Sequence, residues 1–148
     1  MMPKYKTTEI TLKRTIPAPV AEVFDAWLDP SHPATPFNGS EKLLFDARVD
    51  GMFYFLHVIE ATKLPHFGRF TAIDRPGKIQ YSWMSLHTRG LESTVTVTFQ
   101  KKGNDTLLTL NHVNLPDDEL GHAHEGGWNH YLGLFEELFA PKKVAAKA

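Results

Sequence analysis

The sequence predicts an α+β fold in which a curved antiparallel sheet of about seven strands wraps around one long C-terminal helix. Three observations predict it. Short segments with a two-residue hydrophobic period follow one another between residues 41 and 112, separated by turns rich in Gly, Pro, Asn and Asp. A helical period appears only at residues 20–28 and after residue 116. The chain has 148 residues, enough for one domain with its own core.

The first strand is predicted at residues 9–16, whose apolar positions are Ile10, Leu12 and Ile16. Arg14 stands on this apolar face and needs an acidic partner, because an unpaired buried charge is too costly. Three side chains are candidates: Asp25, Glu125 and Glu136. Prolines 17 and 19 end the strand, and a short amphipathic helix follows at residues 20–28.

Six more strands are predicted between residues 42 and 112. Segment 52–59 is apolar on both faces, so its period does not reveal which side faces inward. A loop through Pro65 is expected before the next strand, at residues 66–73. Alternation is clearest at the two last strands, whose inward side chains are Val95, Val97, Phe99, Leu108, Leu110 and His112.

The last helix is predicted at residues 117–139, after Pro116 and with three acidic residues in its first turn. Its apolar stripe is Trp128, Tyr131, Phe135 and Leu138. Gly126 and Gly127 each cost about 1 kcal/mol in a helix interior, so we expect a strand or a ligand to approach the backbone there. We assign residues 1–140 to a single domain and residues 141–148 to a flexible basic tail.

Composition and motifs exclude several classes of protein. Cysteine is absent, which excludes disulfides, thiolate metal sites and a cysteine nucleophile. No apolar run approaches the roughly 18 residues of a membrane helix, and the N-terminus has no signal-peptide core, so we expect a cytoplasmic protein. The net charge is −1, and residues 1–140, without the three lysines of the tail, carry −4, which argues against nucleic acid as a partner. No nucleotide-binding, metalloprotease or serine-hydrolase motif is present.

Three histidines near the start of the last helix raise the question of a metal site. His122 and His124 point about 200° apart if both are helical, so they cannot face one ion together with His130. No acidic residue stands beside them in a recognisable ligand spacing. We therefore predict no metal site and no cofactor.

Several segments form a recognisable ordered set: RTIPAPVAEVFDAW at 14–27, DARVDG at 46–51, Gly68, residues 79–83, 93–97 and 105–112, and Gly127-Trp128 with Leu132 and Leu138. In this order they resemble the START-like superfamily, also called SRPBCC or birch-pollen-allergen-like. Within the superfamily the chain resembles the branch named for the C-terminal domain of the activator of the heat-shock-protein-90 ATPase. This resemblance implies the helix-grip fold, with a cavity between the sheet and the last helix.

The resemblance also places the candidate site. Relatives often carry polar residues where this chain has Met52 and Tyr54, which favours an inward orientation of the alternate positions in that strand. Trp83 and Trp128 should then face each other from opposite walls. His112 points inward and is either a core histidine, bonded to backbone or to Arg14, or a cavity residue. The predicted cavity residues are Trp27, Phe37, Phe53, Phe55, His57, Tyr81, Trp83, Val97, His112, Trp128 and Tyr131.

We expect a binding protein rather than an enzyme: a small hydrophobic or amphipathic molecule would occupy this cavity. The first alternative is a cyclase- or dehydratase-like lyase acting on a bound carbonyl compound. In that case His112 or His57 would be the general acid–base, and Tyr54 or Tyr81 would polarise the carbonyl. The second alternative is a protein that contacts a chaperone. Relatives with that activity have a separate N-terminal domain, which we do not expect here because the first strand begins at about residue 8.

Overall fold

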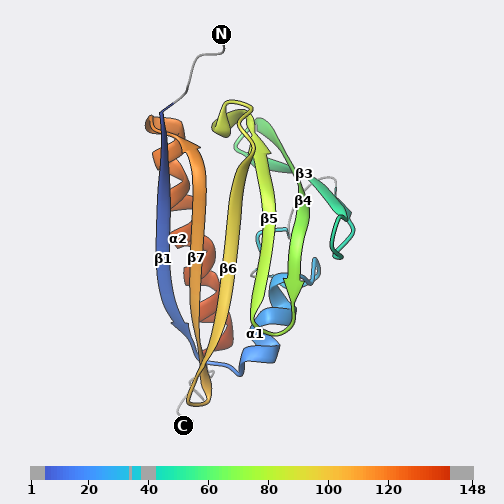
Figure 1. Cartoon of the computed structure of the whole chain (residues 1–148), viewed down its shortest axis with the longest axis vertical. Helices are drawn as coiled ribbons and strands as arrows, with labels where there is room; N and C mark the ends of the chain where they lie inside the picture. The colour runs from blue at the N-terminus through green and yellow to red at the C-terminus, as the bar shows by residue number, and fades with distance from the viewer. Residues whose placement is uncertain (1–5, 34, 38–42, 141–148) are drawn as a thin grey trace.

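A computed structural model describes residues 6–33, 35–37 and 43–140, and Figure 1 shows the arrangement of its elements. The predicted tail at 141–148 lies outside the described residues. The elements, in chain order, are β1 (Thr7–Ile16), α1 (Val20–Trp27), β2 (Leu43–Phe45), β3 (Met52–Ile59), β4 (Thr62–Asp74), β5 (Lys78–Ser85), the 3₁₀-helix η1 (Leu86–Thr88), β6 (Ser93–Lys102), β7 (Asp105–Pro116) and α2 (Glu119–Phe139).

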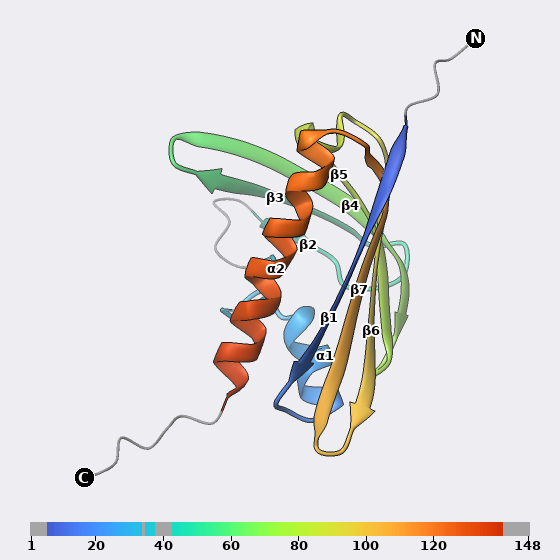
Figure 2. The same ribbon diagram turned by 90° about the vertical axis from the view of Figure 1, so that its left-hand side faces the viewer.

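The strands form one seven-stranded sheet in the order β1-β7-β6-β5-β4-β3-β2, and every pairing is antiparallel. Both helices lie against the same face of this curved sheet (Figure 2). Helix α2 packs on β1 and β7, and α1 packs on β6 and β7. The predicted α+β helix-grip architecture is therefore confirmed. Among the helices in the described part of the chain, none combines the length and apolarity needed to cross a membrane.

Strand β4 begins earlier than the sequence predicts, so the expected loop through Pro65 is wrong. Pro65 lies inside the strand, opposite Leu56 of β3. Pairing of β4 with β5 starts only at His66, one residue later. Pro65 therefore has a strand neighbour on one side alone, and this is a position where a strand tolerates a residue without an N–H group.

The buried stripe of α2 also differs from the predicted one. Leu138 is 48% exposed, whereas Leu132 is fully buried together with Phe135. The stripe therefore follows the spacing of Trp128, Leu132 and Phe135 rather than reaching Leu138. The helix begins two residues later than predicted, because Asp118 caps it by accepting a hydrogen bond from the Gly121 N–H at 3.0 Å.

The prediction that a strand approaches Gly126 and Gly127 is wrong. Both are exposed, and a Cβ atom built on either would meet nothing within 4 Å. Close approach occurs elsewhere. A Cβ on Gly68 would lie 1.9 Å from the Ser82 carbonyl oxygen, and one on Gly121 would lie 1.7 Å from the Pro116 carbonyl oxygen. These two positions exclude any side chain.

Arg14 joins the first strand to the last helix. Its guanidinium donates to Glu136 Oε1 at 3.2 Å and to Asn129 Oδ1 at 3.4 Å. Asp25, another of the candidate partners, instead accepts two hydrogen bonds from Arg75, at 2.8 and 2.9 Å. The structural interpretation of Arg14, an ion pair between strand and helix, thus agrees with the contacts, with Glu136 as the partner.

A buried chain of hydrogen bonds connects α2 to three strands. The Trp128 indole N–H donates to His112 Nδ1 at 2.9 Å, and His112 Nε2 lies 2.7 Å from Ser93 Oγ. The Ser93 hydroxyl donates in turn to the Trp83 carbonyl. An indole nitrogen can only donate, so Nδ1 of the neutral imidazole accepts and Nε2 donates. Burial lowers the pKa of His112 well below its usual value, so the ring is neutral. His112 is a core histidine, but its partners are side chains of α2 and β6 and not Arg14.

The glycine geometry predicts opposite effects of two alanine substitutions. Gly68→Ala should destabilise the protein by about 3 kcal/mol, because the new methyl group collides with backbone and with the Phe53 ring. Gly126→Ala should stabilise it by about 1 kcal/mol through helix propensity alone. Urea unfolding measures both free energies. A destabilised Gly126→Ala variant would contradict the open surroundings of that position.

Removal of the buried imidazole should lower stability and weaken its pH dependence. His112→Leu leaves the Trp128 indole N–H without an acceptor and removes the N–H donor to the Ser93 oxygen, which keeps its bond to the Trp83 carbonyl; the cost is on the order of 2–5 kcal/mol. In the wild type the pKa of His112 is depressed, so its contribution is present above the unfolded value of about 6.5 and is lost as the pH falls below it. Urea unfolding at pH 7.5 and pH 5 should therefore show a smaller loss of stability on acidification in the variant.

The control is His130→Leu, the same substitution at an exposed position of α2. It should keep the full pH dependence of the wild type. Equal pH dependence in His112→Leu and the wild type would show that His112 titrates normally in the folded protein.

Candidate functional site

A cavity of about 230 Å³ lies between residues 123–131 of α2 and the strands β3, β4 and β5. This volume exceeds the roughly 150 Å³ cavity that admits benzene and is below the range of about 300–1,000 Å³ typical of drug-sized ligands. The space therefore suits a molecule of one or two rings. The lining residues are Phe55, His57, Leu64, His66, Trp83, His87, Ala123, His124, Gly127, Trp128 and Tyr131.

The cavity has a buried apolar end and an exposed rim. Phe55, Trp83 and Trp128 are at most 6% exposed, and the Trp83 and Trp128 rings lie 5.1 Å apart between centroids. Ala123 and Gly127 on α2 are exposed and carry little or no side chain. A molecule can therefore reach the tryptophans along this side of the helix.

Histidines supply most of the polar atoms of the lining. Burial lowers the pKa of His66 to about 4 and also depresses the pKa values of His57 and His124; nearby imidazoles lower all three further. These rings are therefore neutral near pH 7. No Lys, Arg, Asp or Glu belongs to the cavity lining formed by the described residues.

Two of these histidines have a fixed tautomer. His66 Nδ1 lies 3.0 Å from the Leu64 carbonyl oxygen, and His124 Nδ1 lies 3.0 Å from the Leu120 carbonyl oxygen. A carbonyl oxygen can only accept, so each Nδ1 carries the proton of its neutral ring. Each Nε2 is then a hydrogen-bond acceptor, and neither has a partner among the residues that the structure describes.

The Trp83 indole N–H is another unpaired group. Within the described part of the chain it is the single fully buried side-chain polar atom that has no hydrogen-bond partner. Its ring packs between aromatic neighbours, with centroids 5.0 Å from His66 and 5.7 Å from Phe55. The apolar end of the cavity is thus built from rings in mutual contact.

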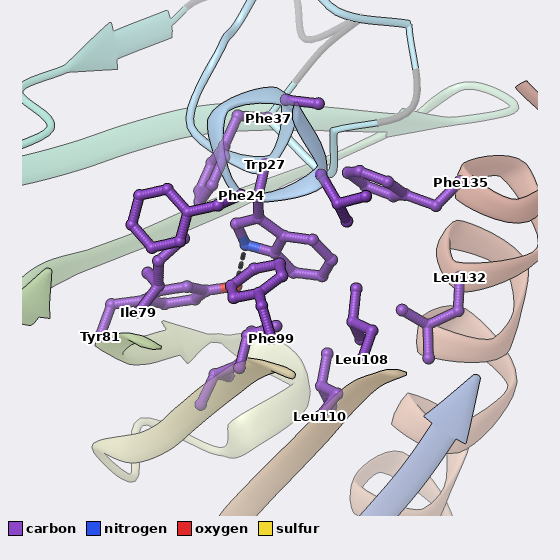
Figure 3. Close-up of a cluster of buried hydrophobic side chains, with 14 of the residues drawn as sticks. Phe24, Trp27, Phe37, Ile79, Tyr81, Phe99, Leu108, Leu110, Leu132 and Phe135 are labelled. Carbon is purple, nitrogen blue, oxygen red and sulfur yellow. Dashed lines mark hydrogen bonds between the residues drawn. The ribbon is translucent and has the colours of Figure 1, made fainter. Parts of the chain in front are cut away.

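Five of the eleven predicted cavity residues line this space: Phe55, His57, Trp83, Trp128 and Tyr131. The other six lie outside this lining: Trp27, Phe37, Phe53, Tyr81, Val97 and His112. All six are buried in the hydrophobic core or its hydrogen-bond network. Figure 3 shows Trp27 and Tyr81 within that core, joined by a hydrogen bond of 3.3 Å.

The core is closed at this end because aromatic rings fill it. Phe37 lies 5.1 Å from Phe53 and 5.8 Å from Tyr81, and Trp27 stacks on Phe135 at 5.1 Å. Inward orientation therefore does not by itself make a residue a cavity residue. An open space remains where α2 faces the β3–β4 hairpin.

The predicted cavity residues do not include the remaining six lining residues, although Gly127 was expected to be approached by a strand or a ligand: Leu64, His66, His87, Ala123, His124 and Gly127. Two of them carried a usable signal. His66 shares the inward parity of Phe70 along β4, and His124 stands four residues before Trp128 on α2. His87 lies in the short turn η1, for which no hydrophobic period was available.

The three histidines of α2 that raised the question of a metal site, His122, His124 and His130, each make different contacts. His122 Nε2 lies 2.8 Å from Asp117 Oδ1, while the His124 ring bonds to helix carbonyls. His130 is exposed, and its ring contacts that of Tyr131. Among residues 6–33, 35–37 and 43–140, no group of three or more His, Asp or Glu side chains is arranged to hold a metal ion.

Solved structures share this architecture. A protein from Rhizobium loti matches with a TM-score of 0.76 at 19% identity, over 90% of this chain and 98% of its own. A protein from Chromobacterium violaceum matches with a TM-score of 0.74 at 26% identity, over 90% and 98%. An HSP90 activator from Plasmodium falciparum matches with a TM-score of 0.71 at 25% identity, over 88% and 94%.

The sequence itself supplies the family assignment. No curated protein matches it. Residues 17–140 match the family described as Activator of Hsp90 ATPase homolog 1-like protein. This match covers α1, the strands β2 to β7 and α2. The resemblance noted from the ordered segments is thereby confirmed, and the chain belongs to the family of Activator of Hsp90 ATPase homolog 1-like proteins.

Proposed function

We propose that this domain binds a small, largely apolar molecule in the cavity between α2 and the β3–β4 hairpin. The observation that carries the proposal is the cavity of about 230 Å³, whose inner walls are Phe55, Trp83 and Trp128. The side chains that line an empty cavity lack the dispersion contacts that they would make in a packed core. A bound apolar molecule supplies these contacts. Burial of its apolar surface would drive binding, at about 25 cal/mol per Å².

The lyase alternative has less support from the geometry. Of its four candidate groups, only His57 lines the cavity. Tyr81 is buried in the core with Trp27, and His112 is held by Trp128 and Ser93. Tyr54 alternates with the inward residues of β3 and so lies on the outer face of the sheet. Acid–base chemistry would have to rely on His57 without the tyrosine partner that was expected.

The two adjacent glycines of α2 provide a matched test. A leucine at either position has free space for its Cβ, but only Gly127 lines the cavity. Gly127→Leu should therefore weaken naphthalene binding at least about tenfold by filling the rim, while Gly126→Leu should leave affinity within about twofold. Both variants should be at least as stable as the wild type, because both gain helix propensity.

Naphthalene binding can be followed by NMR through the indole N–H signals of the three tryptophans. Trp83 and Trp128 line the cavity and should shift strongly, whereas Trp27, in the filled core, should shift least. Equal affinity in the two leucine variants would place any binding elsewhere. An unchanged spectrum at saturating naphthalene would refute the proposed function.

We propose contact with an Hsp90-type chaperone as a second candidate function, which the family membership and the Plasmodium falciparum HSP90 activator favour. A continuous apolar row crosses the outer face of the sheet, away from α2. Cross-strand pairing aligns Leu44 with Tyr54, Tyr54 with Phe67, and Phe67 with Met84. Leu44 is 61% exposed and Phe67 is 38% exposed. We refer to these four residues as the outer row.

A charge placed in the outer row should weaken such a contact. Phe67→Lys should reduce binding to purified Hsp90 at least about tenfold in a calorimetric titration, because it buries an ammonium group in the interface. Thr11→Lys, an exposed position on β1 at the opposite edge of the sheet, is the control and should bind like the wild type. No binding by the wild type would exclude this second function and leave the cavity proposal untouched.

A further inference from the structure

The composition of the cavity lining limits the charge of its ligand. The lining contains no ammonium, guanidinium or carboxylate group from the described residues, and its buried imidazoles are neutral near pH 7. An anion or a cation entering this space would lose its hydration and find no opposite charge, which is strongly unfavourable. The ligand should therefore carry no net charge.

The orientation of the imidazoles limits its hydrogen-bonding groups. His66 and His124 both use Nδ1–H on a backbone carbonyl, so both offer Nε2 as an acceptor. Both rings are held in place. His66 stacks on Phe55 with centroids 4.9 Å apart and planes 4° apart, and His124 packs edge-to-face on His112 at 5.2 Å. A fixed acceptor at the edge of an aromatic cavity favours a ligand that brings a donor.

We infer that the ligand is an uncharged hydroxylated aromatic molecule, whose ring lies against Trp83 and Trp128 and whose hydroxyl donates to Nε2 of His66 or His124. The inference rests on the proposed function, since it assigns a chemical class to the occupant of the same cavity. The Tyr131 hydroxyl, half-buried in the same lining, is available for a further polar group on the ligand.

A matched ligand series tests the chemical class on the wild-type protein. At pH 7.5, 2-naphthol should bind about tenfold more tightly than naphthalene and 2-methoxynaphthalene, because it alone donates a hydrogen bond. The anion 2-naphthoate should bind more weakly than naphthalene. Dissociation constants come from NMR titrations of the Trp83 and Trp128 indole signals.

Variants locate the acceptor. His66→Phe and His124→Phe keep a ring but remove Nε2, so the double variant should bind 2-naphthol and naphthalene within about threefold of each other. His130→Phe, exposed and outside the lining, should keep the full preference for 2-naphthol. If the double variant does not fold, the wild-type ligand series alone still decides the chemical class.

The outcomes separate this inference from the proposed function. Equal affinity for 2-naphthol, naphthalene and 2-methoxynaphthalene would overturn the hydroxylated class while leaving the binding function intact. If 2-naphthoate bound most tightly of the four compounds, the inference that the ligand carries no net charge would be wrong. A preference for 2-naphthol that persists in the double variant would overturn the assignment of the acceptor. Binding of none of the four compounds would refute the proposed function itself.

Discussion

The hydrogen-bond chain from Trp128 through His112 and Ser93 to the Trp83 backbone holds the helix and the sheet in one relative position. Each buried polar group in it has a partner, and removal of any member leaves another unpaired in a medium where that is costly. Both tryptophans of the cavity wall belong to this chain. The two rings, whose centroids lie 5.1 Å apart, are therefore positioned by directional bonds as well as by hydrophobic contact.

The hydrogen-bonded residues lie between two parts of the interior of the domain, the packed core and the cavity. On the side of α1, the rings of Trp27, Phe37 and Tyr81 fill the volume between helix and sheet completely. On the other side α2 packs on β1, β7 and η1, while the β3–β4 hairpin stands apart from it. The same architecture thus yields a solid core at one end and an accessible cavity at the other, and aromatic composition alone does not distinguish them.

Periodicity and turn chemistry sufficed for the order of the elements, because each strand and helix leaves its own period in the sequence. The inward orientation of Trp83 and Trp128 was likewise predictable from the period, whereas that of Phe55 was favoured only by the resemblance to the family. Parity could not separate lining residues from core residues, since that difference depends on how far the helix stands from each strand. The contributions of His66 and His124 depend on their neighbours in space, and the exposed position of Gly127 depends on the rotation of α2 about its axis. None of these is a local property of the chain.

The contact between Gly68 and the Phe53 ring has a consequence for how the sheet assembles. Strand β3 is apolar on both faces, with Phe53 and Phe55 inside and Met52 outside, so hydrophobic burial would accept it almost equally well after a slip of one residue. The glycine faces Phe53 directly across the β3–β4 ladder, and no side chain could occupy its place under that ring. A slip of one residue would pair Phe53 with Phe67 or Arg69 instead. Gly68 therefore helps to fix the register of the β3–β4 hairpin, although β3 is apolar on both faces.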